Sequence, residues 1–206
     1  MTFTHFEILV EEPSAEAALE CLMPRLLAGR ATFRLHPFEG KHDLLSKLES
    51  RLKGYAKYRP PESCVVVMVD RDDQDCEELK EQLEGAAVKA GLKTRSKRSP
   101  RGEFVVLNRI LIEELEAWFF GDVEALVAAY PGVPITLAKK NKYRDPDAVK
   151  GGTWEALERV LQTAGHHQGG LAKIQAARDI ATHMEPGRNR SKSFRVFRDA
   201  ILASLP

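Results

Sequence analysis

The sequence contains few cysteines, and they do not follow a spacing that is typical of a cysteine-rich site. Cys21, Cys64 and Cys76 are an odd number without a CxxC pair. This excludes a disulfide framework and a cysteine-based zinc site as leading interpretations. Because they lie in apolar or helical contexts, we expect small buried side chains. The six histidines are scattered apart from His166-His167, and none belongs to an HExxH pattern.

Long apolar runs and an excess of one charge are also lacking. No run approaches the roughly 20 residues that a membrane-spanning helix needs, and no signal peptide precedes Phe6. We therefore expect a soluble, cytoplasmic protein without a membrane partner. With 31 Lys and Arg against 30 Asp and Glu, the overall charge argues neither for nor against a nucleic-acid partner.

The first half of the chain instead shows apolar strand patterns that alternate with helical ones. This alternation predicts an α/β fold, Toprim-like or Rossmann-like, with a four-stranded, mainly parallel sheet flanked by helices. Residues 1–107 would form this core, and Ser14 is the expected N-cap of its first helix. The predicted strands are residues 6–10, 32–38, 64–69 and 104–107, and the predicted helices are residues 15–27, 41–58 and 77–90.

From residue 108 onward the pattern is mostly helical, without a strand signal. We expect residues 108–206 to form a helical C-terminal extension that packs on the core and overhangs the carboxyl edge of the sheet. The two parts would make one compact unit. The predicted helices are residues 110–120, 122–129, 153–164, 171–183 and 194–205.

Acidic residues follow two of the predicted strands. Asp70 and Asp72 end the apolar run that starts at Cys64, and Glu11 follows the first strand. Strands one and three are commonly neighbours in such sheets, and ligands bind at the carboxyl ends of the strands. Three carboxylates at one edge repel each other unless a cation neutralises them. The spacing therefore predicts a site for Mg²⁺ or Mn²⁺.

Two further positions are candidates near the same edge. Glu113 and Glu116 share a helix face, and either would complete a second metal position for phosphodiester cleavage. The alternative is a solvated helix start whose acids the helix dipole favours. Lys41, directly after Gly40, would neutralise phosphate or transition-state charge, or would be an ordinary surface lysine.

Two basic segments have both a functional and a plain interpretation. Residues 93–101 form either a solvated loop or an arm that contacts phosphates. Residues 188–193 precede the last helix and are able to present backbone amides to an anion. In the plain interpretation of that segment, Ser193 is the N-cap of the helix.

The residues Val10-Glu11, followed by a helix and later by Asp70-Arg71-Asp72, resemble the Toprim domain of topoisomerases, primases and overcoming-lysogenization-defect nucleases. The resemblance implies acid/base chemistry for Glu11 and Mg²⁺ binding by Asp70 and Asp72. One departure is that Toprim proteins usually have glycine after the glutamate, where this chain has Glu12. Glycine lets the backbone approach phosphate closely.

A closer resemblance covers nearly the whole chain and points to a Toprim-like family known as domain of unknown function 4276. It implies a Toprim-like fold, and the association of such proteins with ATPases implies an ATPase partner in defence or repair. The segments that carry this resemblance are residues 8–14, 38–45, 69–73, 113–118 and 189–194.

Together these observations predict a Mg²⁺-dependent phosphoryl-transfer protein, in particular a nuclease acting on DNA or RNA. The metal ligands would be Asp70, Asp72 and Glu116, with Glu11 as a further ligand or as the acid/base, and Lys41 on the phosphate. The alternative is a non-catalytic Toprim-like regulatory or sensor module, which Glu12 and the neutral charge favour. A receiver domain also has acids at strand ends, but the long helical second half does not suit it.

Overall fold

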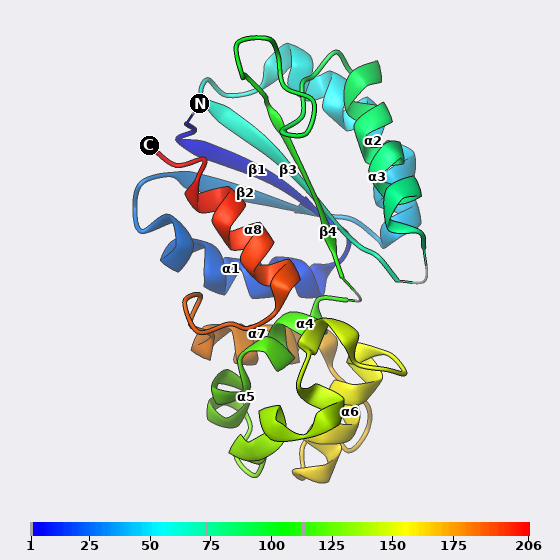
Figure 1. Ribbon diagram of the computed structural model, residues 1–206, viewed down its shortest axis with the longest axis vertical. Coiled ribbons are helices and arrows are strands. Elements are labelled where there is room, and N and C mark those ends of the chain that lie inside the picture. Colours follow the sequence, from blue (N-terminus) through cyan, green and yellow to red (C-terminus); the bar gives the residue numbers. More distant parts are fainter. Residues whose placement is uncertain (1, 73, 113) are drawn as a thin grey trace.

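The chain folds around a four-stranded sheet in which all neighbouring strands are parallel (Figure 1). The computed structural model describes residues 2–72, 74–112 and 114–206. The strand order is β2-β1-β3-β4, so the first and third strands are neighbours as the sequence predicts. The strands are β1 (His5–Val10), β2 (Thr32–Pro37), β3 (Ser63–Asp70) and β4 (Val106–Leu111).

The central strand β3 is apolar along almost its whole length because both of its faces are buried. Val66 and Met68 belong to the hydrophobic cluster on one face of the sheet. Val65, Val67 and Val69 belong to the cluster on the other face. Continuous apolar runs are typical of parallel strands that are covered on both sides.

Helices cover both faces of the sheet (Figure 1). One pair contributes to the cluster that contains Val66, and the other pair contributes to the cluster that contains Val67. The α/β fold with helices on both faces is therefore confirmed. The first pair is α1 (Pro13–Leu27) and α8 (Lys192–Leu202), and the second pair is α2 (Lys41–Tyr58) and α3 (Cys76–Lys89).

The remaining helices lie on the side of α1 that faces away from the sheet, and α4 follows the end of β4 (Figure 1). None of the helices in the described part of the chain is long and apolar enough to cross a membrane. The α-helices are α4 (Glu116–Gly121), α5 (Val123–Ala129), α6 (Thr153–Thr163) and α7 (Lys173–His183), with 3-10 turns η1 (Ile135–Lys139), η2 (Asn141–Tyr143) and η3 (Pro146–Ala148).

The helical half and the sheet share one hydrophobic cluster, which includes Phe6 of β1, Leu19 of α1 and Ile180 of α7. Helix α7 packs directly against α1. The guanidinium of Arg25 in α1 donates to the carbonyl oxygen of Met184, just after α7, at 2.6 Å. The last helix, α8, returns to the sheet and closes the chain.

Two predicted boundaries are wrong. Strand β4 covers Val106–Leu111 instead of residues 104–107, and the next helix starts at Glu116 instead of Ile110. The run from Ile110 to Ile112 is apolar throughout, so its periodicity does not separate a strand from a helix. At the start of α1, the N-cap is Glu12 rather than Ser14, because Pro13 takes the first helical position, which proline favours.

The start of α8 also differs from the sequence-based expectation. Its N-cap is Ser191, whose hydroxyl accepts from the N–H of Phe194 at 3.1 Å. Ser193 instead accepts from Nε1 of Trp118 at 3.0 Å. The anion at this helix terminus is the chain's own Asp147, which accepts from the Ser191 and Ser193 hydroxyls at 2.8 and 2.9 Å.

Replacing Asp147 with alanine should lower the free energy of unfolding by about 2 kcal/mol, because a helix cap and charge-assisted hydrogen bonds are lost together. Asp147→Asn should lose less, since an amide oxygen still accepts. Urea denaturation measures both, with Glu81→Ala on the exposed surface of α3 as the control. Equal stability of Asp147→Ala and the wild type would contradict this role.

Candidate active site at the carboxyl edge of the sheet

The ends of β1 and β3 bring Glu11 and Asp70 together. The two strands are parallel, with Leu9 opposite Val67, so their carboxyl ends meet at the same edge. The backbone N–H of Asp70 donates to Oε2 of Glu11 at 3.1 Å. The Glu11 carboxylate therefore lies at the end of β3, next to the strand that carries Asp70.

Lys41 reaches the same edge from the start of α2. Its Nζ donates to the carbonyl oxygen of Arg71 and to Oδ2 of Asp72, both at 3.0 Å. Gly40 before it has a φ of 100°, and its N–H donates to the carbonyl oxygen of Glu11 at 2.9 Å. A left-handed glycine thus ties the start of α2 to the end of β1. The only ammonium-to-carboxylate contact of Lys41 among the described residues is the one to Asp72.

Glu116 enters the site from the helical half, as the first residue of α4. It is buried, with 3% of its surface exposed. Burial raises the pKa of Glu116 to about 7, and the charges of Glu114 and Glu12 act in the same direction. The ammonium of Lys173 at the start of α7 opposes this increase. A buried acid with a pKa near neutrality carries a proton part of the time at physiological pH.

Burial and neighbouring carboxylates also shift the pKa values of Asp70 and Glu11. Burial raises the pKa of Asp70 well above its usual range, and repulsion from Glu11 and Glu116 adds to the effect. Burial also raises the pKa of Glu11, although the Asp70 N–H and the Lys41 ammonium favour its charged form. Charge repulsion thus links five residues, here named the strand-end acids: Glu11, Glu12, Asp70, Asp72 and Glu116.

Glu12 is the member of this group that sequence reasoning did not include. Its φ of −149° is ordinary extended backbone, so this position does not require the glycine of Toprim proteins. Its carboxylate accepts from the hydroxyl of Ser14 at 2.5 Å. Its position next to Glu11, at the end of the first predicted strand, is the sequence feature from which Glu12 could have been recognised.

The sequence also singled out Glu113 as a candidate. Glu113 lies outside the described residues. The neighbouring Glu114 accepts from the N–H and hydroxyl of Thr153 at 3.0 and 2.6 Å and from the N–H of Trp154 at 3.0 Å. Glu114 therefore binds the start of α6 and holds the helical half together.

Metal ligation by Glu11, Asp70, Asp72 and Glu116 stays a prediction. In the described ranges, no three His, Cys, Asp or Glu side chains are arranged so that they could hold a metal ion as they stand. The chemistry of the strand-end acids fits a hard divalent cation, because all of their donors are carboxylate oxygens. A cation would compete with Lys41 for Asp72.

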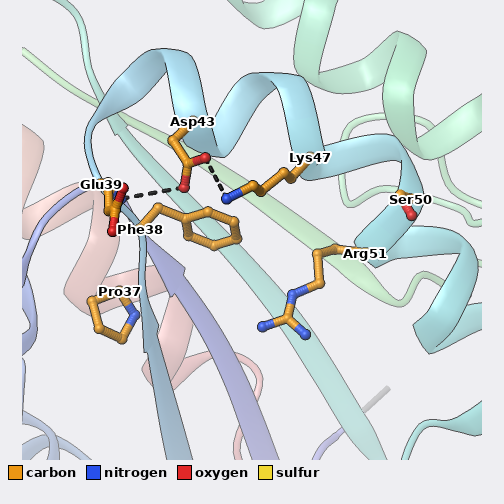
Figure 2. Close-up of a pocket in the computed structure, with 7 residues that line it drawn as sticks. All are labelled: Pro37, Phe38, Glu39, Asp43, Lys47, Ser50 and Arg51. Atoms are coloured by element: carbon orange, nitrogen blue, oxygen red, sulfur yellow. Dashed lines mark hydrogen bonds and ion pairs between the residues drawn. The ribbon is translucent and has the colours of Figure 1, made fainter.

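Two surface grooves flank helix α2. One, of about 480 Å³, includes Lys41, His42 and Gln74 in its lining and so reaches the edge that carries the strand-end acids. The other, of about 540 Å³, lies around Phe38 and Arg51 (Figure 2). Within it, Asp43 pairs with Lys47 and accepts from the N–H of Glu39, and the Arg51 guanidinium lies over the ring of Phe38. None of the strand-end acids lines this second groove.

The fold and this edge define an α/β protein with carboxylates gathered at the ends of neighbouring parallel strands. A family model described as a domain of unknown function, DUF4276, matches residues 10–202. The chain therefore belongs to the DUF4276 family, which confirms the family membership that the closer resemblance predicts. Searches of the curated proteins and of the solved structures give no match.

Replacing Glu116 with glutamine should stabilise the protein in a pH-dependent way. The pKa of Glu116 rises from 4.5 to about 7 on folding, so the folded state loses stability as the pH rises through this window. At pH 8 the variant should gain about 3 kcal/mol over the wild type, and the gain should vanish near pH 4. Urea denaturation across this range, with Glu81→Gln as the control, tests the slope; a constant difference would contradict it.

Proposed function

We propose that this protein is a divalent-cation-dependent phosphoryl-transfer enzyme, a nuclease that acts on DNA or RNA at the strand-end acids. The observation that carries the proposal is the convergence of Glu11, Asp70 and Glu116, which come from β1, β3 and α4. Burial of several carboxylates at one place is unfavourable by itself, and a bound cation would relieve it.

A Toprim-like relationship is part of this proposal. Its support is the pairing of β1 with β3, which puts the glutamate after one strand beside the Asp-x-Asp after the other. The family model does not describe an activity, so the site itself must carry the argument.

Each residue has a distinct proposed role. Asp70, Asp72 and Glu116 would hold Mg²⁺ or Mn²⁺, which when bound neutralises phosphate charge and activates a water molecule. Glu11 would add a ligand or move a proton, and burial raises its pKa toward the range that suits an acid/base. Lys41 would exchange its contact with Asp72 for one with a phosphate oxygen.

One observation favours the alternative, a non-catalytic regulatory or sensor module that works with an ATPase partner. Glu12 adds a carboxylate where Toprim proteins usually have glycine, and its charge is among those that raise the pKa of Asp70 and Glu116. A further negative charge weakens phosphate binding unless a cation compensates for it. The two proposals differ in whether bound metal leads to cleavage.

Divalent cations should stabilise the wild-type protein through Asp70. At a free Mg²⁺ or Mn²⁺ concentration about ten to a hundred times the Kd, the gain is about 1.4–2.7 kcal/mol. Thermal unfolding with and without each metal should show this gain in the wild type and in the control Asp43→Asn, whose carboxylate lies on α2 outside the site. The gain should disappear in Asp70→Asn; an equal gain in that variant would exclude this site.

Cleavage is tested by incubating the protein with labelled single- and double-stranded DNA and RNA, with Mg²⁺, Mn²⁺ or EDTA. We expect metal-dependent cleavage that falls at least about a hundredfold in Asp70→Asn and in Glu11→Gln, because each removes a carboxylate that would hold the metal or move a proton. Cleavage that survives Asp70→Asn would refute the nuclease. Metal binding through Asp70 without cleavage would favour the regulatory module.

A further inference from the structure

A further cleft, of about 380 Å³, lies on the other side of the sheet from α2, along the outer edge of β4 and next to α8. Figure 1 shows α8 beside β4, with the segment before β4 looping over the start of the strand. The residues that line the cleft include Arg95 and Ser96 before β4, Asn108 and Arg109 in β4, and Val196 and Asp199 in α8.

The outer edge of β4 is only partly covered. The N–H of Val106 donates to the carbonyl oxygen of Lys93 at 3.0 Å, and the N–H of Arg95 donates to the carbonyl oxygen of Val106 at 2.9 Å. The backbone pairing ends there. Further along the strand, the carbonyl oxygen of Asn108 accepts from Nη1 of Arg109 at 2.8 Å.

The cleft holds two guanidinium groups without a matching carboxylate. Within the described residues, neither Arg95 nor Arg109 forms an ion pair, and the buried Nε of Arg109 has no hydrogen-bond partner. Arg95 donates to the carbonyl oxygen of Ala200 at 3.2 Å. The one carboxylate in the lining, Asp199, accepts from Arg198 at 2.8 Å.

The electrostatics agree with this geometry. Burial, together with repulsion from Arg95, lowers the pKa of Arg109 to about 10. The guanidinium of Arg109 nevertheless remains charged at neutral pH. A half-buried cation without a counter-charge lowers stability, and an anion in the cleft would remove this penalty.

The position of Arg109 connects this cleft to the strand-end acids. Arg109 lies opposite Met68 in the sheet, two residues before Asp70 on the neighbouring strand. Side chains alternate along a strand, so Arg109, Met68 and Asp70 share one face of the sheet. The Cα atoms of Arg109 and Asp70 are offset by about 7 Å along the strand and about 5 Å across it. The Arg109 guanidinium lies on the side of Arg95 and Cys64, and a short oligonucleotide is able to span the distance from there to the strand-end acids.

We propose that Arg95 and Arg109 bind a backbone phosphate of a nucleic-acid strand and so anchor the strand beside the strand-end acids. Arginine suits this role because its planar fork matches a phosphate group with two hydrogen bonds. Lys97, Arg98 and Arg101 of the same segment, residues 93–101, are exposed. The nucleic-acid ligand rests on the proposed function, whereas the anion preference of the cleft rests on its own geometry.

Fluorescence anisotropy with a short labelled single-stranded DNA in EDTA tests the cleft without any metal-dependent step. Arg95→Met and Arg109→Met should each weaken binding about tenfold. The double variant should reduce the slope of log K against log salt by about 0.7, since one phosphate of the single strand is no longer neutralised. Arg34→Met, an exposed arginine on the opposite edge strand β2, should bind as the wild type does.

Thermal unfolding without DNA separates binding from structure. Arg109→Met should be at least as stable as the wild type, because an unpaired half-buried charge is removed. If that variant unfolds, Arg95→Met and Arg109→Lys carry the test, and Arg109→Lys should restore part of the affinity by keeping the charge.

These experiments distinguish phosphate binding by the cleft from nuclease activity at the strand-end acids. Wild-type affinity in both Arg95→Met and Arg109→Met would contradict the proposal that the cleft binds a nucleic-acid phosphate. A protein that binds inorganic pyrophosphate but does not bind DNA would contradict it as well. Binding that is retained in Asp70→Asn and lost in Arg109→Met supports the cleft even if cleavage is never observed. Cleavage through Asp70 with unaltered binding in both arginine variants would keep the nuclease and reject the cleft.

Discussion

The parallel pairing of β1 with β3 is the constraint on which the rest of the structure depends. Both strands are buried on both faces, so their register is set by the packing of apolar side chains on each side. That register places the first residue after β1 beside the last residue of β3. A shift by one residue would move the apolar set of β3 to the wrong faces and would separate Glu11 from Asp70.

Charged residues are distributed unevenly around the paired strands β1 and β3, although the whole chain is almost neutral. Acids gather at the carboxyl edge, where burial and mutual repulsion raise the pKa of Glu11, Asp70 and Glu116. Unpaired arginines gather beside β4, where burial lowers the pKa of Arg109. The acids at the carboxyl edge and the arginines beside β4 are both unfavourable for stability, and the fold itself does not need them. Such arrangements are more frequent at functional sites than elsewhere.

The sequence allowed the sheet, the neighbouring strands one and three and the convergence of Glu11 with Asp70 to be predicted, because strand periodicity and buried apolar runs are local signals. It did not predict the extent of β4, since Ile110 to Ile112 fits a strand and a helix equally well. From the sequence, residues 93–101 were interpreted either as a solvated loop or as an arm that contacts phosphates. The cleft at Arg109 depends on the approach of α8, more than eighty residues later in the chain, which no local pattern encodes.

The hydrophobic cluster shared by the sheet and the helical half has a consequence for how the chain is handled. Phe6, Leu19 and Ile180 belong to one continuous core, although they come from opposite ends of the sequence. Cutting the chain after β4 would expose the surface of α1 that α7 covers and would remove α8 from the sheet. A shortened α/β fragment would therefore aggregate, and it would also lack Glu116. It would not be suitable for studying the site.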